Sequence, residues 1–555
     1  MKLNNLTPEE ASINLDIEKI EKEFYSKQKS DSVKRGKSFQ HLCFSIICEK
    51  DPNDINDEDV IDGSDEEGID IVFIEELDNN LFVKIINCKS SLADNFSAND
   101  LTLLKTGLQY VFEEPKLTIQ NFPNLKLRDK IEIIRSNHDR IKSIDVYYCV
   151  FKGSTIEPNV KRKKQEIDNR YSKFIKVQYP YSEFNIHLVS SKDLFTIRVK
   201  NLESLRGIEV KVPYYDTSLI MKPDISTEEG IRGYITTVRA EEIAKLVNQW
   251  GDKLFEKNIR GWLKYNKKNQ EIYNSCISNE SGLFWFLNNG ITMIGDKVIP
   301  SDHAGVWKIT NLQIVNGQQT ARMIYEAWNN KLLKKNVTVM CRIYEANEMG
   351  FITKITKATN SQSSIGSRDL MSNDPKQLAI QIYFEKLGYF YERQRGEKKP
   401  SWSYKSIITS AKLAQISLGV LCKKPSLARK NIEDNFFNPQ KYYNNIFDRN
   451  PNELVIAYLL YKYCDDLKNE NDQITYFGVL HIARIMWEYL SNQLKNDLEN
   501  SIKLMEQSEL MIKKEYNKAV NHLTDLIKEE IMDKSAGNYL SRIEVDENIF
   551  KSFSN

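Results

Sequence analysis

An aspartate and a lysine that could together support phosphodiester cleavage lie on either side of residue 80. Asp70 lies at the start of one apolar run, GIDIVFIEE, and Lys89 ends the next, NLFVKIINCKS, with a turn at LDNN between them. Both runs are expected to be strands of one hairpin, which would bring Asp70 close to Asn87 and Lys89. An aspartate and a second oxygen ligand can hold Mg²⁺ or Mn²⁺, and a nearby lysine can orient water or stabilise charge at phosphorus. We therefore predict Asp70, Asn87 and Lys89 as catalytic residues of a Mg²⁺-dependent (or Mn²⁺-dependent) endonuclease, with Asp70 as metal ligand.

A second carboxylate would complete such a metal site, and the strongly acidic segment before the hairpin offers several. We predict Glu49 as the additional metal ligand, with Asp65 and Glu66 as alternatives that spacing alone does not separate. The simpler interpretation is an acidic hairpin that carries a solvated lysine, because a short pattern of this kind also arises without function.

The hairpin pattern resembles the PD-(D/E)xK nuclease superfamily, in particular its Mrr-like branch. The resemblance implies a restriction-endonuclease-like domain in which Asp70 is the principal metal ligand and Lys89 the catalytic lysine. The sequence departs from the family pattern at Asn87, where Glu or Gln is usual, and at Gln40, where an upstream helix often carries Glu. A degenerate, inactive nuclease fold is therefore an alternative.

Clusters of uncharged amides form a second candidate site, centred on the stretch QIVNGQQTARMIYEA. A strand-like run meets Asn-Gly-Gln-Gln-Thr and a helical pattern follows at once, so the glycine permits a close backbone approach to a ligand. Similar clusters stand in FEKNIRGWL, FWFLNNGITMI and ITKATNSQSSIGSRDL. Helix caps and turns explain any one cluster alone. Taken together they predict a site that reads a polar ligand through Asn258, Arg260, Asn288, Asn289, Asn316, Gly317, Gln318, Gln319, Thr320, Asn360 and Gln362.

The same series of segments, with GYFYERQRGE after them, resembles the abortive infection phage resistance (AIPR) family over roughly residues 225–400. The resemblance implies a bacterial antiphage protein, commonly with a restriction-endonuclease-like domain in front. The turn is also similar to D-G-Q-H-R of DNA-modification-associated proteins and, more remotely, to the nucleotide-binding turn of ParB-type partition proteins. Those relatives suggest a nucleotide or DNA ligand, although Thr320 stands where they carry arginine.

The segment from Arg393 to Lys430 is the most basic part of the chain, with ten Lys or Arg against one Glu. Basic side chains can neutralise phosphates and aromatic rings can stack on bases. A solvated helical face is the alternative. We predict nucleic-acid contacts, with DNA favoured over RNA, at Arg393, Arg395, Lys398, Lys399 and Trp402.

These candidate residues require several folded units, because 555 residues exceed what one core usually holds. Alternating strands and helices predict an α/β multidomain protein. We expect a restriction-endonuclease-like α/β domain over 1–205, which opens on one helix over 15–50, and a central mixed α/β AIPR domain over 206–345. That domain would hold the strands IRGYITTVRA, GITMIGDKVIP, WKITNLQIVNG and NVTVMCRIYE. A mainly helical region is expected over 346–555.

The bulk composition excludes several classes of protein. Lys plus Arg (78) nearly balance Asp plus Glu (77), so no polyanion-binding signature covers the whole chain. No apolar run resembles a secretory signal or a membrane span, and the eight scattered cysteines lack zinc-site spacing and are expected to be reduced core thiols. We expect a cytoplasmic protein without membrane contact, with a nucleotide or phage-derived molecule as candidate trigger and a homodimer as candidate assembly. A catalytically inactive, nucleotide- or nucleic-acid-binding regulator of phage defence is the alternative function.

Overall fold

The computed structural model divides into two compact units, Met1–Asn201 and Leu202–Asn555, and each unit is considered by itself. It describes residues 6–553 except 29, 62–67, 78, 92–94, 116–118, 120–122, 154, 203–204, 215–231, 259–266, 302–304, 347–353, 356–357, 359–366, 395–396, 398–402, 431–432, 495–500, 504, 506–508 and 529–535. Within that described part, no helix combines the length and apolar character needed to cross a bilayer.

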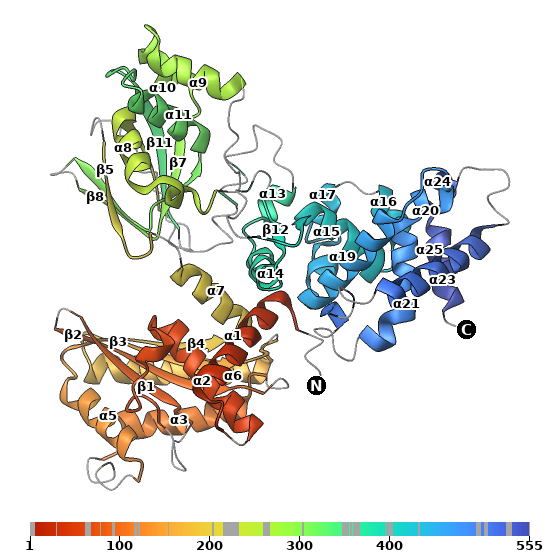
Figure 1. The fold of residues 1–555 in the computed structure, drawn as a ribbon. Helices are drawn as coiled ribbons and strands as arrows, with labels where there is room; N and C mark the ends of the chain where they lie inside the picture. The colour runs from red at the N-terminus through yellow and green to blue at the C-terminus, as the bar shows by residue number, and fades with distance from the viewer. Residues whose placement is uncertain are drawn as a thin grey trace. The chain divides into compact units, whose positions relative to one another are not determined.

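The first unit, red to yellow in Figure 1, is built on a four-stranded mixed sheet with the order β1-β2-β3-β4. β1 (Ile71–Leu77) and β2 (Asn80–Lys89) form the predicted antiparallel hairpin. β3 (Ile141–Val150) lies parallel to β2, and β4 (Glu183–Val189) lies parallel to β3. The strands predicted from SIDVYYCVFKG and EFNIHLVS are thus confirmed.

Two groups of helices supply apolar residues to the two faces of this sheet. One face shares a buried core with α3 (Ala98–Phe112), α5 (Leu125–Ser136) and α6 (Pro158–Gln178). On the opposite face, α2 (Asp31–Cys48) packs through Phe44, whose ring centroid lies 5.4 Å from that of Phe73 on β1. α1 (Pro8–Phe24) and α7 (Ser191–Asn201) pack against α2.

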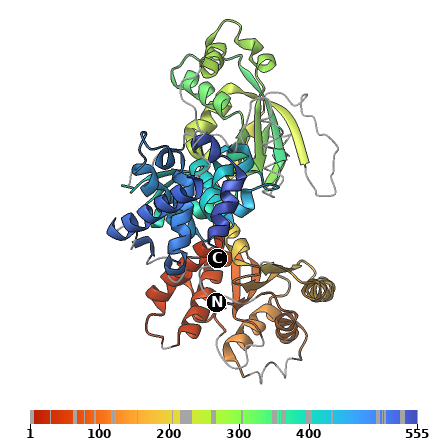
Figure 2. The same cartoon turned by 90° about the vertical axis from the view of Figure 1, so that its right-hand side faces the viewer.

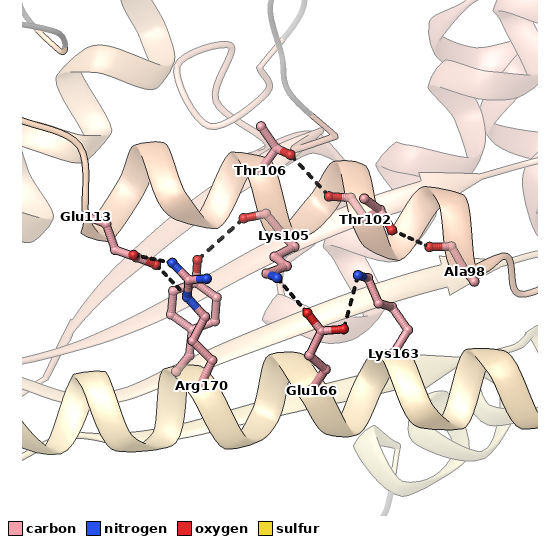
Figure 3. Close-up of polar contacts among 9 residues, drawn as sticks. Ala98, Thr102, Lys105, Thr106, Glu113, Lys163, Glu166 and Arg170 are labelled. Carbon is pink, nitrogen blue, oxygen red and sulfur yellow. Dashed lines mark hydrogen bonds and ion pairs between the residues drawn. The ribbon is translucent and has the colours of Figure 1, made fainter.

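Ion pairs join α3 to α6 at the surface of the first unit (Figure 3). Lys105 Nζ lies 2.6 Å from Glu166 Oε1, and Arg170 Nε donates to Glu113 Oε1 over 3.1 Å. Exposed pairs of this kind contribute little to stability because water and salt screen their charges, so the buried core rather than these pairs holds the helices in place.

The prediction of one helix over 15–50 is wrong, because the chain breaks between α1 and α2 near Ser30. Each of the two helices carries its own buried apolar stripe, with Ile13, Ile17 and Ile20 on α1, and the helices pack against each other. One straight helix could not bring its own two halves into contact.

The central part of the second unit, green in Figure 1, holds two sheets. The first has the order β10-β7-β11-β6, from β10 (Gln313–Asn316), β7 (Ile291–Gly295), β11 (Thr338–Glu345) and β6 (Arg232–Arg239). The second has the order β5-β9-β8, from β5 (Glu209–Pro213), β9 (Val306–Thr310) and β8 (Lys297–Ser301). α11 (Gln318–Asn329) packs against α8 (Ala240–Trp250) and α9 (Lys267–Ile277).

Two of the predicted central strands are each divided between the two sheets. WKITNLQIVNG becomes β9 and β10, because Asn311 adopts a left-handed conformation (φ 58°) between them and redirects the chain. The Asn311 side chain accepts a hydrogen bond from the Gly207 N–H and donates one to Asp296, which stabilises that conformation. GITMIGDKVIP is likewise split into β7 and β8 at Asp296.

The C-terminal part, cyan to blue in Figures 1 and 2, is mainly helical, as predicted. Its large apolar core includes residues of α19 (Pro451–Asp466), α21 (Val479–Leu494) and α23 (Glu509–Ile527). A short parallel pair, β12 (Phe390–Glu392) and β13 (Ile407–Thr409), precedes these helices in the chain. The mixed α/β class and the helical C-terminal region are therefore confirmed.

Candidate functional site

Asp70 and Asn87 are in direct contact at the open end of the β1–β2 hairpin, away from its turn. Because Ile71 pairs with Ile86 in an antiparallel register, the residues just beyond them, Asp70 and Asn87, lie opposite each other on one face. Asn87 Nδ2 donates to Asp70 Oδ2 over 3.2 Å, and the Cys88 N–H donates to the same oxygen over 2.6 Å. Gln40 Nε2 on α2 donates to Asp70 Oδ1 over 2.7 Å. The carboxylate is thus fixed by three donors from two elements.

The Asp70 carboxyl is almost fully enclosed, with 5% of the residue exposed. Burial raises its pKa to about 7, because a desolvated charge is costly, although the Cys88 N–H, the charge of Lys89 and the Gln40 amide all oppose that rise. Lys89 therefore lies close enough to act electrostatically on Asp70. A carboxyl with a pKa near neutrality, beside a cation, is typical of functional sites.

The Asn87 side chain leaves one buried oxygen free of hydrogen bonds. Its Nδ2 donates both to Asp70 Oδ2 and to the Gly68 carbonyl oxygen, 2.8 Å away, which fixes the orientation of the amide because both neighbours are acceptors. Asn87 is 3% exposed, and its Oδ1 has no hydrogen-bond partner. Such an oxygen, next to a carboxylate, suits a hard cation that prefers oxygen ligands.

Glu49, the predicted second carboxylate, lies further along α2 than Gln40, the α2 residue that contacts Asp70. Glu49 caps the C-terminal end of α2, nine residues beyond Gln40, which corresponds to about 13 Å along the helix axis. Its charge acts on Tyr147 instead, where it contributes to a raised pKa whose main cause is burial. The alternatives Asp65 and Glu66 lie outside the described residues. In the described part of the cluster, Asp70 is thus accompanied by amides.

The buried carboxyl of Asp70 gives a pH-dependent contribution to stability. Its pKa stands at about 7 in the folded chain against 3.8 ordinarily, so the stabilisation by the neutral form is complete below about pH 4 and is lost as the pH rises through 7. Asp70→Asn is therefore expected to change stability little at pH 4. At pH 8, in the presence of a chelator, it should stabilise the first unit by up to about 4 kcal/mol.

Amide hydrogen exchange of β1 and β2 in the full chain measures this effect, because slower exchange reports a more stable hairpin. The asparagine oxygen can still accept from Cys88, and the Gln40 amide can turn to accept from the new nitrogen. Equal exchange rates in wild type and variant at pH 8 would contradict a desolvated carboxyl.

The central amides hold two turns of the chain together. Asn288 Oδ1 accepts from the Gly290 N–H over 3.0 Å and from Thr320 Oγ1 over 3.3 Å, so it joins its own turn to the first turn of α11. Gly290 and Gly317 both adopt positive φ, 77° and 88°. A Cβ atom on Gly317 would lie 2.8 Å from the Gly290 carbonyl oxygen, so the two turns approach each other at their glycines.

Other predicted ligand residues are also held by the protein. Asn258 Nδ2 donates to the Ile314 carbonyl oxygen over 3.2 Å, and Gln319 Oε1 accepts from Asn269 over 3.0 Å. The Asn289 carbonyl oxygen accepts from Arg342 over 3.4 Å. Asn316 and Gln318 also lie at this junction, at the end of β10 and the start of α11, and both have partners. Arg260, Asn360 and Gln362 lie outside the described residues.

Arg393, predicted to contact nucleic acid, is instead surrounded by acceptors of its own unit. Its guanidinium donates to Asn373 Oδ1 over 2.6 Å, to Gln381 Oε1 over 3.2 Å and to the Ser372 carbonyl oxygen. Burial lowers its pKa. The other members of that prediction, Arg395, Lys398, Lys399 and Trp402, lie outside the described residues.

Arg393→Ala is therefore expected to act on stability rather than on affinity. Removal of the guanidinium leaves three acceptors without their charged donor, which should cost roughly 2–4 kcal/mol. Thermal unfolding of the full chain should show the loss. If the chain binds DNA as predicted from the sequence, the slope of the logarithm of the binding constant against the logarithm of the salt concentration should be the same in the variant as in the wild type. If the magnitude of that slope is smaller by about one in Arg393→Ala than in the wild type, Arg393 contacts a phosphate group of DNA instead.

Three cysteines that are far apart in the sequence come together in the first unit. Cys43, Cys88 and Cys149 are all buried, and their sulfur atoms lie within 4.8 Å of one another. Their positions, 45 and 61 residues apart, give no local spacing pattern. The parallel register of β2 and β3, which pairs Cys88 with Cys149, was the one signal available, and it required knowledge of the sheet order.

A protein-family model with the description "AIPR protein" matches residues 255–535, which is half of the chain. The match covers the NGQQT turn, the segments around it and most of the helical C-terminal region. No curated protein and no solved structure matches the chain.

Proposed function

The chain belongs to the AIPR family and is an abortive-infection phage-defence protein, and from this premise we propose that its first unit is a metal-dependent nuclease acting on DNA. The observation that carries the proposal is the contact between Asp70 and Asn87, with Lys89 two residues further along the same strand. The four-stranded mixed sheet, with these residues at the end of its hairpin, supports a restriction-endonuclease-like fold of the PD-(D/E)xK type.

The residues at the hairpin fit a single hard cation. Asp70 Oδ1 accepts one hydrogen bond and keeps a lone pair, and the unpartnered Asn87 Oδ1 would supply a second oxygen. One or two protein oxygens, with water and substrate phosphate, are a common set for Mg²⁺. When bound, Mg²⁺ or Mn²⁺ would stabilise negative charge at the phosphate. Lys89 would orient the attacking water or stabilise the same charge through its ammonium group.

We further propose that the central site, at the junction of Asn288, Gly290, Gly317 and Thr320, senses or positions a ligand. A nucleotide or a DNA element is the class suggested by the similarity of its turn to nucleotide-binding turns. The two turns meet at their glycines, and the contact of Thr320 with Asn288 brings polar groups of both turns to one junction, which supports this second proposal. Occupancy of this site by a nucleotide or phage-derived molecule would then govern the nuclease.

A catalytically inactive regulator is the second candidate, and the amides at the hairpin favour it. Gln40 stands where the family pattern often has Glu, and Asn87 stands where Glu or Gln is usual. Both amides already donate to Asp70. On this alternative, Asp70→Asn leaves phage protection intact, whereas variants of Asn316 or Gln318 remove it.

The deciding experiment is a cleavage assay on the full chain. Plasmid, linear duplex, single-stranded DNA and RNA are incubated with Mg²⁺, Mn²⁺ or a chelator, with and without extracts of phage-infected cells. We expect cleavage of DNA that needs the divalent ion. If no nucleic acid is cleaved under any of these conditions while cells expressing the Asp70→Asn variant still resist phage, the chain is the regulator.

A further inference from the structure

Three thiols from three different elements meet inside the first unit, on the sheet face that α2 covers. Cys43 lies on α2, Cys88 on β2 and Cys149 on β3, where Cys88 and Cys149 are direct lateral partners. The two strand cysteines share a face with Ile86 and Tyr147 through alternation and register, opposite to Asn87. Their sulfur atoms and that of Cys43 lie within 4.8 Å of one another, and no disulfide joins them.

We propose that Cys43, Cys88 and Cys149 form a three-thiolate binding site for a soft d¹⁰ metal ion, Cu(I) or Zn(II). Sulfur atoms bound to one such ion at about 2.3 Å lie roughly 3.8–4.0 Å apart, which the observed cluster accommodates with small side-chain rotations. Binding replaces three S–H bonds by three sulfur–metal bonds and releases the protons to solvent.

The number of ligands distinguishes the two ions. Among the described residues, no fourth His, Cys, Asp or Glu joins the cluster within the same 4.8 Å. Cys43 and Cys149 are 0% exposed and Cys88 is 8% exposed, so there is little access for water as a further ligand. Zn²⁺ in structural sites is almost always four-coordinate, whereas three soft thiolates suit Cu(I). The geometry therefore favours Cu(I), with Zn²⁺ as the second arm of the test.

The surroundings of the cluster also suit a bound ion. Its three ligands stand on a helix and two paired strands, which fix their separation, and the Phe44–Phe73 contact holds α2 against the sheet. Lys89 carries positive charge near Cys88 and offsets part of the negative charge of a metal–thiolate group. The other cysteines of the described part form no such group; Cys464, for example, contacts the sulfur of Met486.

A filled thiolate site would also stiffen the neighbouring hairpin end. The backbone N–H of Cys88 donates to Asp70 Oδ2, so an ion that fixes the Cys88 side chain restrains the same residue that holds the carboxylate. Slower amide exchange over 86–89 is expected on loading. This consequence is independent of whether the first unit cleaves DNA.

Metal content and X-ray absorption of the full, reduced chain test the proposal. Metal-free protein is titrated with Zn²⁺ in one arm and, in the other, with Cu(I) delivered from a competing chelator. We expect about one tightly held ion per chain, with a first shell of three sulfur atoms. The Asp70→Asn variant should keep this ion, which separates the site from the proposed Mg²⁺ site.

Cys88→Ser and Cys149→Ser should each weaken binding by at least about 100-fold. Cys341→Ser, a buried strand thiol outside the cluster, is the matched control and should bind as the wild type does. The proposal is overturned if neither arm yields a sulfur-bound ion, or if Cys88→Ser binds as tightly as wild type. If the serine variants fail to fold, the number of sulfur atoms bound to the ion in the wild-type protein, measured by X-ray absorption, decides whether the proposal stands.

Discussion

Lys89→Ala and Asp70→Asn are each expected to lower the rate of the proposed DNA cleavage by at least about 100-fold, because each removes a charge from the proposed site of phosphodiester attack. In the proposed nuclease, Asp70 would supply the carboxylate oxygen for the divalent ion, and Lys89, whose charge acts on Asp70, would supply the ammonium group. Both variants should also abolish protection against phage in cells. Cleavage rates under single-turnover conditions and plaque counts measure the two effects.

Two features keep this expectation separate from simple unfolding. Lys84 lies on the same strand as Lys89 but on the opposite face of the sheet, where its Nζ donates to the Ile47 carbonyl oxygen. The Lys84→Ala variant should therefore retain cleavage. Asp70→Asn should lose activity while it becomes more stable at pH 8.

Wild-type cleavage should rise between pH 6 and 8, because ionisation of a carboxyl with a pKa of about 7 must precede metal binding. Cleavage by Asp70→Asn at the wild-type rate would refute the assignment.

The contact at the hairpin was predictable because it depends on local pairing alone. Alternation and a short turn determine which residues of two adjacent antiparallel strands face each other, and Asp70 and Asn87 follow from that rule. The Gln40 contact depends on how α2 packs on the sheet, so the sequence could suggest the residue but not the bond. The place of Glu49 depends on the same packing, because sequence distance to Asp70 does not determine position along a helix.

The central part shows where strand patterns mislead. Asn311 lies within an apolar run that looks continuous, yet its left-handed conformation sends the chain from one sheet to another. Asparagine tolerates that conformation, but only the acceptor and donor partners at Gly207 and Asp296, distant in sequence, make it favourable. Prediction of the three-cysteine cluster from the sequence is harder still, because the relative positions of one helix and two strands must be known before the three thiols can be placed together.

Gly290→Ala is expected to unfold the central sheet, at a cost of at least about 3 kcal/mol. Gly290 has φ 77°, and a Cβ there would lie 2.3 Å from the Met340 carbonyl oxygen. Met340 is in the middle of the sheet, on β11, where it pairs with Thr237 of β6, so its backbone cannot retreat without breaking that ladder. Glycine is thus required at position 290 because any side chain there would collide with the Met340 backbone, whether or not the site binds a ligand.

Gly207→Ala is the control that isolates the collision from the backbone strain. Gly207 has nearly the same φ, 70°, but nothing lies within 4 Å of the position of its Cβ, so the variant should cost only about 1–2 kcal/mol. Hydrogen exchange of β7 and β11 in the full chain should rise sharply in Gly290→Ala and little in Gly207→Ala. Equal effects of the two substitutions would mean that strain alone matters and that the turn has room beside Met340. In that case contact with the Met340 backbone would no longer explain why a glycine stands at position 290.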